Sequence, residues 1–306
     1  MIAFVLAEGE PVPAEKRRFY QGQIDRLRAE GLEADLYEFS DQSPALPNSG
    51  TVAVFDIECR KFLRRHLDER RIPHAPLIWN PYAFFMIGQT WVRTSSLVVE
   101  TLVPGMAAGQ MLQKFALGKP VETITVSANY IGCDDHVGPP LASSGRPLIG
   151  CFGAGRLVID FVKSVLIRRM PELVDCQWVH LDSEMPERWR DDLARCDTLF
   201  SFRSLCGSAI PLMDAMASGV VVAGSHGGGL SGIADAENGI WINSATLEII
   251  AEELSAGLSR LEADPAWRRR LIDGASAVAK NNSVDATFPG NLEVWRRLIE
   301  RAHLVR

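Results

Sequence analysis

The feature that most constrains the fold of this 306-residue chain is an alternation between short runs rich in β-branched residues and longer segments of helical periodicity. This alternation is typical of an α/β protein with parallel sheets, because each buried strand is followed by a helix that covers one face of the sheet. The N-terminal half is predicted to contain strands at 2–7, 34–39, 51–57, 76–80, 95–103 and 122–127, and helices at 14–30, 58–71 and 106–117.

The alternation is interrupted at 136–147, where Gly, Pro and Ser cluster between two periodic regions. Such clusters mark loops, so this segment is predicted to be a linker between two domains. Asp264 and Pro265 fit the N-cap and first position of a late helix. Two doubly wound halves place a ligand at the carboxyl ends of their strands, in the cleft between them. The second half is predicted to contain strands at 148–153, 176–182, 198–202, 219–224 and 239–242, and helices at 157–168, 187–195, 210–218, 245–261, 265–280 and from about 291.

Composition narrows the class of protein. Hydrophobic residues make up 47% of the chain and charged residues 23%, which excludes a disordered or collagen-like chain. The formal net charge of -6 argues against nucleic-acid binding. The N-terminus lacks a basic region and becomes acidic at Glu8, so no secretory signal is predicted. The longest apolar stretch is broken by Asn80, Pro81 and Gln89 and is too short to span a bilayer, so any membrane contact would be peripheral.

The cysteines indicate a reducing compartment. The chain has 6 Cys, with no CxxC pair and no histidine at the spacing of a zinc ligand. They are predicted to be reduced thiols of a cytoplasmic protein, and no metal site is predicted. The six are Cys59, Cys133, Cys151, Cys176, Cys196 and Cys206.

The most informative chemistry precedes the predicted helix at 210–218. Gly207 and Ser208 lead into this helix, whose first backbone N–H groups are free to receive an anionic phosphate. Asp214 is the single charge within the apolar run AIPLMDAMA. Two interpretations of Asp214 are open: it favours the positive end of its own helix, or it accepts hydrogen bonds from a ligand hydroxyl such as a ribose.

Basic residues follow the predicted strand ends of the second half. Arg156 comes directly after a Gly-x-Gly turn that ends with Gly155, where an arginine can bind a phosphate in bidentate fashion. Arg203 follows the strand at 198–202 and would point into the cleft or into solvent. His226 lies in the turn SHGGG, where phosphate contact and simple exposure are equally open.

Residues 201–242 combine spaced glycines, one proline and the run DAMASG. The positions that matter are Gly207, Pro211, Asp214, Ala215, Met216, Ala217, Gly219, Val221, Val222, Gly227 to Gly229, Asn238 and Gly239. This pattern resembles the donor domain of the retaining GT-B glycosyltransferases of family 4, with E-G-F-G-x-P-x-x-E-A-M-A-x-G-x-P-V-V, then a Gly-Gly turn and an Asn-Gly strand. Residues 128–140 are similar to the family's linker, and LIGCFGAGRL to the strand and turn that open its donor domain.

The resemblance implies a GT-B architecture, in which two Rossmann-like doubly wound domains face a central cleft. The domains would be 1–140 on the acceptor side, 141–285 for the donor, and a C-terminal helix at 286–306 that crosses back to the first domain. The implied activity is a metal-independent, hexosyltransferase-like transfer from a UDP- or GDP-linked sugar to a glycan, lipid-linked or protein acceptor, with retention of configuration. No cofactor is implied. Polysaccharide or glycoconjugate biosynthesis, in the cytoplasm or at the inner face of the membrane, would be the setting.

The resemblance also assigns roles to residues. The family's two glutamates fall at Cys206 and Asp214, so the E-x7-E motif is degenerate, because a cysteine does not accept hydrogen bonds as a carboxylate does. Asp214 would hold the nucleotide ribose. The basic pair facing the leaving diphosphate falls at Arg156 and Lys163, and Lys163 is alternatively a solvated helix lysine. Asn80 stands where the family has a histidine near the acceptor. The implied donor-binding residues are Gly9, Gly155, Arg203, Cys206, Gly207, Ser208, Asp214 and His226.

Two other functions stay open. The substitutions at Cys206 and Asn80 also fit a GT-B protein that has lost catalysis and serves as a partner or binding subunit. The turn GAGRLV at 153–158 partly matches a dinucleotide fingerprint, with Asp182 at the end of the next strand, which would indicate an NAD-dependent oxidoreductase. Val158 replaces the third glycine of that fingerprint. The donor base, the acceptor and the oligomeric state, including a homo- or hetero-dimer, are not readable from the sequence.

Overall fold

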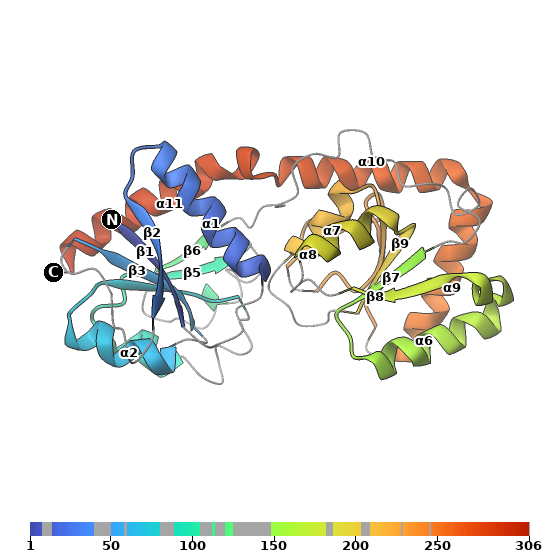
Figure 1. Ribbon diagram of the computed structural model, residues 1–306, viewed down its shortest axis with the longest axis horizontal. Coiled ribbons are helices and arrows are strands. Elements are labelled where there is room, and N and C mark those ends of the chain that lie inside the picture. The colour runs from blue at the N-terminus through green and yellow to red at the C-terminus, as the bar shows by residue number, and fades with distance from the viewer. Residues whose placement is uncertain are drawn as a thin grey trace. The chain divides into compact units, whose positions relative to one another are not determined.

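The computed structural model divides into two compact α/β units, each built on one parallel sheet (Figure 1). Within the described residues, one unit holds the chain up to Ile124 and again from Val284, and the other holds the chain from Leu148 to Ser283. The expected linker at 136–147 lies outside the described residues. The described residues are 1–7, 14–39, 50–57, 60–79, 89–104, 112–113, 120–124, 148–181, 186–202, 209–227, 229–244 and 246–305.

The first unit has the sheet order β2-β1-β3-β4-β5-β6, with every described pairing parallel. Helices α1 and α11 cover one face of this sheet and α2 covers the other (Figure 1). Strands with both faces covered are apolar throughout, as β1 is. The strands are β1 (Ile2–Ala7), β2 (Ala34–Phe39), β3 (Val52–Asp56), β4 (His74–Leu77), β5 (Thr101–Pro104) and β6 (Val121–Ile124), and the helices α1 (Ala14–Ala29), α2 (Arg60–Glu69), α4 (Gln89–Thr94) and α11 (Val284–Leu304).

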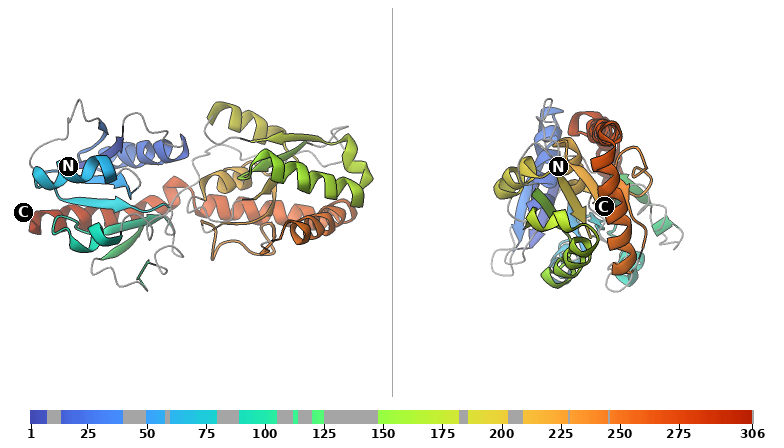
Figure 2. Two further views of the ribbon diagram at one scale, coloured as in Figure 1. Left: turned by 90° about the horizontal axis from the view of Figure 1, so that it is seen from below. Right: turned by 90° about the vertical axis from the view of Figure 1, so that its right-hand side faces the viewer.

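The first unit contains both ends of the described chain, because β1 and α11 belong to it (Figure 2). An aromatic core joins these two elements. The ring of Phe4 in β1 lies 5.4 Å from that of Tyr20 in α1 and 5.3 Å from that of Trp295 in α11. The buried indole N–H of Trp295 donates to Gln23 Oε1 at 2.9 Å. The apolar stripe predicted for the last helix is therefore a core element of the first unit.

Three predicted element boundaries in the first unit are wrong. The last helix begins at Val284, ahead of the expected start near Asn291, because Pro289 is accommodated inside it while Phe288 is buried. The strand expected at 76–80 begins at His74. The strand expected at 95–103 spans Thr101–Pro104, since the apolar residues before it are buried with only an isolated bridge at Val98. Of the helix expected at 106–117, only residues 112–113 are described, and both are helical.

The second unit has the sheet order β11-β10-β9-β7-β8, again with all described pairings parallel. Helices α6 and α9 cover one face, and α7, α8 and α10 cover the other (Figure 1). The strands are β7 (Leu148–Phe152), β8 (Gln177–His180), β9 (Thr198–Ser201), β10 (Val221–Gly224) and β11 (Ile240–Trp241), and the helices α6 (Arg156–Arg169), α7 (Pro186–Arg195), α8 (Ile210–Ala217), α9 (Leu247–Ala263) and α10 (Pro265–Asn281).

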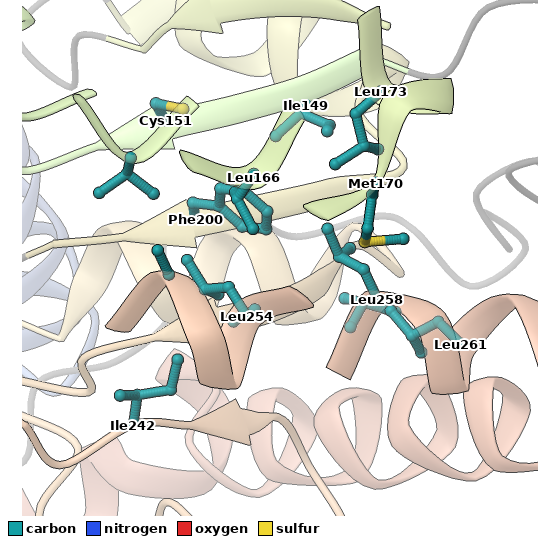
Figure 3. Close-up of a cluster of buried hydrophobic side chains, with 14 of the residues drawn as sticks. Ile149, Cys151, Leu166, Met170, Leu173, Phe200, Ile242, Leu254, Leu258 and Leu261 are labelled. Atoms are coloured by element: carbon teal, nitrogen blue, oxygen red, sulfur yellow. The ribbon is translucent and has the colours of Figure 1, made fainter. Parts of the chain in front are cut away.

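The core of the second unit lies between its sheet and the helices. Leu166 of α6 and Leu254 and Leu258 of α9 gather around Phe200 of β9 (Figure 3). At the start of α10, the Asp264 side chain accepts a hydrogen bond from the Trp267 N–H at 2.8 Å, with a proline in the first turn, which confirms the predicted cap.

Both sheets place the first strand of the unit between its second and third strands. The chain therefore leaves the sheet in opposite directions at β1/β3 in the first unit and at β7/β9 in the second. Ligands of open α/β sheets bind outside the carboxyl ends of the strands at such switch points. These two places are where a functional site is expected. No helix in the described ranges is both long enough and apolar enough to cross a bilayer.

Glu100 is a buried titratable group that directly precedes β5, so it lies at the amino edge of the first sheet, opposite the carboxyl edge that carries the switch point. It is 0% exposed and pairs with Arg301 of α11, which also contacts Glu122 at 3.2 Å. Burial raises the pKa of Glu100 to about 7, against the lowering effect of Arg301. The folded protein therefore holds this proton more tightly than the unfolded chain does.

We expect Glu100 to weaken the first unit as pH rises. The unfolded chain loses this proton at the ordinary pKa of 4.5, whereas the folded protein holds it up to a pKa of about 7. The free energy of unfolding therefore falls as the pH rises from about 4.5 to about 7. Glu100→Gln should reduce the fall in the free energy of unfolding between about pH 5 and about pH 7.5, measured with urea. An identical fall in the wild type and the variant would contradict this account.

Candidate functional site

The start of α6 forms an open helix N-terminus at the end of β7. Gly155 is the N-cap, has extended backbone geometry and supplies no side-chain cap to the helix. Arg156 is the first helical residue, and both it and Gly155 are exposed. The first N–H groups of a helix have no intrahelical partner and carry a partial positive charge. An anion can therefore reach both the backbone amides and the Arg156 guanidinium.

Asp214 is buried in α8, the helix that follows β9. Residues 210–216 are all buried, and Asp214 is 1% exposed. It is the fifth residue of α8, beyond the first turn, where attraction to the positive helix end fades. This position disfavours the helix-dipole interpretation. Asp214 also has an interaction within the chain, but an ionised carboxylate has about four acceptor sites and can take a further hydrogen bond.

The strand register brings these segments to one edge of the second sheet. Phe152 of β7 and Gly224 of β10 both pair with Ser201 of β9, so the segments that follow the three strands leave the sheet side by side. Gly224 has a φ of 113°, and a Cβ there would lie 2.2 Å from the Ser201 carbonyl oxygen. Only glycine fits this close approach. The turn that carries His226 is thereby held close to β9.

Six of the predicted site residues lie outside the described ranges. Five others lie within the described residues: Gly155, Arg156, Lys163, Asp214 and His226. Gly155 and Arg156 follow β7 and Asp214 lies in the helix after β9, so these three flank the switch point. The residues outside the described ranges are Gly9, Asn80, Arg203, Cys206, Gly207 and Ser208.

Lys163 lies away from Arg156. The two are seven residues apart on α6, which corresponds to about 10 Å along the helix axis. The Lys163 Nζ atom is 5.6 Å from the centroid of the Trp178 ring in β8, a cation–π geometry. At the end of β8, His180 Nε2 lies 3.1 Å from the Ala154 carbonyl oxygen in the turn before α6. These contacts connect β8 to α6 and to the turn before it, and Lys163 contacts Trp178 while Arg156 lies at the start of the helix.

The first unit contains an ion pair at its switch point that sequence reasoning missed. Lys16 lies in the first turn of α1, which follows β1, and Asp56 is the last residue of β3. Their side chains form a salt bridge and are 9% and 5% exposed as residues. Both have further interactions within the chain. An acidic residue that ends the buried strand VAVFD was the available signal, because strand ends collect functional side chains.

Trp79 forms an aromatic platform beside this ion pair. Its ring centroid lies 5.8 Å from Lys16 Nζ and 5.4 Å from the ring of Phe19. Its indole N–H points to Tyr20 Oη at 3.4 Å. Asn80, the residue predicted to lie near the acceptor, follows Trp79 directly in the sequence. The contacts of Trp79 therefore fix the chain directly before Asn80.

The described cysteines have raised pKa values. Burial raises the pKa of Cys151 and of Cys196 to about 12, which keeps both thiols protonated and unreactive. Burial also raises the pKa of Cys176. Across the described ranges, no three His, Cys, Asp or Glu side chains come together as a metal site.

Structural comparison identifies the fold. HepE from Anabaena, solved in complex with UDP, matches 97% of this chain over 99% of its own, with 13% identity and a TM-score of 0.63. Sucrose-phosphate synthase from Thermosynechococcus elongatus matches 98% of this chain over 99% of its own, with 13% identity and a TM-score of 0.63. The chain therefore has the GT-B fold of these glycosyltransferases. At this level of identity the likeness establishes the fold alone.

Longer proteins with the same fold also match. TarM from S. aureus, solved in a complex that includes UDP, matches 81% of this chain with 12% identity and a TM-score of 0.62. The chain spans 55% of TarM. No protein-family model matches the sequence, and a search of curated proteins finds no match either.

Proposed function

We propose that this chain is a glycosyltransferase that uses a UDP-linked sugar as donor and a hydroxyl of a glycan as acceptor. One observation carries the proposal: the open N-terminus of α6 with Arg156, and α8 with buried Asp214, follow adjacent strands and flank the switch point of a GT-B donor unit. The UDP complexes of the similar structures favour uridine over other bases.

In the proposed reaction, the bond between the anomeric carbon and the diphosphate oxygen breaks, and UDP leaves with the bonding electrons. The acceptor oxygen bonds to the same face of the anomeric carbon and loses its proton to the departing diphosphate, so configuration is retained. Arg156 and the first amides of α6 stabilise the charge that develops on the diphosphate, in the role that a metal ion has elsewhere. Asp214 holds the ribose by accepting hydrogen bonds from its hydroxyls.

The first test is a thermal-shift screen of the purified chain against UDP, GDP, ADP, dTDP and NAD. A ligand that binds only the folded protein raises the free energy of unfolding by RT ln(1 + [L]/Kd), about 2.7 kcal/mol at a concentration of 100 Kd. We expect UDP to stabilise the chain most. UDP release should then be measured with UDP-glucose, UDP-galactose and UDP-N-acetylglucosamine, with and without added glycans.

The other outcomes of this screen would indicate a different function for the chain. Stabilisation by UDP without UDP release from any donor would identify a binding subunit, the function that Cys206 in place of a carboxylate favours. Stabilisation by NAD alone would overturn the proposal. The order of the described strands in the second unit differs from the order typical of dinucleotide-binding folds, because among them β8 is an edge strand.

We expect Asp214→Asn to weaken UDP binding by about 10- to 100-fold, because it removes hydrogen bonds to a charged acceptor. The sharper readout compares UDP with 2′-deoxy-UDP by calorimetry. The wild type should prefer UDP, and the variant should lose that preference. A purely structural role for Asp214 would lower the affinity for both ligands equally. Asp191→Asn, at an exposed position in α7, is the matched control and should leave both affinities unchanged.

A further inference from the structure

A pocket lies beside β11, the edge strand of the second sheet, away from the strands β7 and β9 that flank the switch point. It has a volume of about 470 Å³, within the range of ordinary small-molecule sites. One wall is the segment between β10 and β11, and the other is formed by α9 and α10. The proposed reaction does not use this pocket, although His226 and Gly239, which sequence analysis singled out, are among its lining residues.

Aromatic rings line both walls of this pocket. On the strand side, the ring of Trp241 lies 6.1 Å from that of His226, edge to face. On the helix side, the Arg260 guanidinium stacks over the ring of Trp267 at 4.0 Å. His226, Trp241 and Trp267 are half-buried and Arg260 is exposed, so a ligand can reach part of each ring and the outer face of the guanidinium. Flat rings with a nearby polar rim suit the apolar faces of pyranose sugars.

The charges in the pocket are separated onto the two walls. Asp235 and Glu237 lie on the loop wall, and Arg260 and Arg270 on the helix wall. No ion pair joins these four described residues across the pocket. One wall therefore offers hydrogen-bond acceptors and the other offers donors. A sugar hydroxyl both donates and accepts, so a saccharide satisfies the two walls at once.

The loop wall is held in place before any ligand arrives. Asn238 is 2% exposed, and its amide oxygen accepts from the Trp241 indole N–H at 2.8 Å and from the Asp235 backbone N–H at 3.0 Å. Its amide nitrogen donates to the Ile233 carbonyl at 2.8 Å. A Cβ on Gly274 of α10 would lie 2.1 Å from the Glu237 carbonyl oxygen, so the loop packs directly on the helix wall. Ligand binding then needs little ordering of the protein.

We propose that this pocket binds a neutral saccharide and holds a glycan chain at a distance from the transfer site. The proposal rests on the proposed function, because it assigns the glycan to the same chain that would extend it. A phosphate or nucleotide is disfavoured, because two carboxylates offset the two guanidiniums and leave no net positive charge to attract an anion.

The test uses the full chain, fluorescently labelled, on a printed array of neutral and acidic glycans. We expect wild-type protein to bind neutral glycans, and Arg270→Ala to weaken that binding at least tenfold through the loss of charged donors. Arg270 is exposed, so this substitution should not disturb folding. Arg269→Ala is the matched control: Arg269 is the adjacent exposed arginine of α10, pairs with Asp273 at 3.1 Å and does not line the pocket. It should bind glycans as the wild type does.

A second variant and a second ligand separate the outcomes. Glu237→Gln, on the opposite wall, should also weaken glycan binding, and both variants should keep the melting temperature and the UDP-induced thermal shift of the wild type. Absence of glycan binding, or equal binding by the wild type and both pocket variants, would overturn the saccharide site while leaving the UDP result intact. Binding restricted to acidic glycans would also overturn it. Absence of a UDP-induced thermal shift in the wild-type protein would instead count against the proposed function.

Discussion

Replacing Arg156 with alanine is expected to lower kcat for UDP release from a UDP-sugar by about 10²- to 10³-fold, or about 2.7–4 kcal/mol of transition-state stabilisation. Arg156 is the first residue of α6 and follows the N-cap Gly155, which supplies no side chain to the helix terminus, so in the proposed reaction its guanidinium and the first helix amides bind the same diphosphate. Charge on the diphosphate grows as the glycosyl bond breaks. The effect should therefore fall mainly on kcat, with a smaller change in KM for the donor.

Two matched variants separate this role from a general charge effect. Arg168→Ala removes an exposed arginine from the last turn of the same helix and should leave kcat within twofold of the wild type. Arg156→Lys keeps the charge but loses the forked geometry, so it should recover only part of the activity. If Arg156→Ala and Arg168→Ala have the same kcat, the diphosphate is not stabilised at α6.

The fold was predictable because the apolar runs and glycine positions in the sequence coincide with the buried strands and helix ends of the structure. Strands such as β1 and β7 are buried on both faces, so their apolar runs are continuous and easily recognised. Gly219 has a φ of 72° and follows the end of α8, where the Val220 N–H bonds to the Ala215 carbonyl at 3.2 Å. That left-handed position favours glycine, which explains in physical terms why the run DAMASG ends a helix. The predicted α/β architecture with two parallel sheets is confirmed.

The errors arose where tertiary contacts overrule local preference. The last helix was predicted from about 291, yet α11 begins at Val284 and continues through Pro289, with both Phe288 and Trp295 buried. The pocket at β11 combines Trp241 with Trp267 and Arg270, which are separated in sequence and share no periodic pattern. Such a site follows from packing between a loop and two helices, and no single segment of sequence indicates it.

The ion pair at the switch point of the first sheet was missed for the same reason, since Lys16 and Asp56 are 40 residues apart. We expect Asp56→Ala to destabilise the chain by about 3–5 kcal/mol, because it leaves the buried Lys16 ammonium without its carboxylate. The melting temperature should fall by roughly 10 °C. Thermal unfolding and urea unfolding of the purified variant measure this effect directly.

The control is an exposed ion pair that joins Arg17 of α1, the residue after Lys16, to Glu38 of β2. Arg17 and Glu38 form a salt bridge at 2.6 Å, but their side chains are 49% and 54% exposed, so Glu38→Ala should cost no more than about 1 kcal/mol. A similar loss in Asp56→Ala and Glu38→Ala would show that burial does not set the strength of these pairs.

The double variant Lys16→Met/Asp56→Leu tests whether the pair serves function as well as stability. Replacing both charges with apolar side chains should restore most of the lost stability, because neither member of the ion pair is then left buried without the other. If the pair positions the segments that follow β1 and β3, the double variant should bind UDP normally through the second unit yet show a raised KM for the glycan acceptor. Restored stability together with an unchanged acceptor KM would limit the pair to folding. A raised acceptor KM with a normal UDP affinity would place acceptor recognition at this switch point, because the substitution leaves the second unit unchanged.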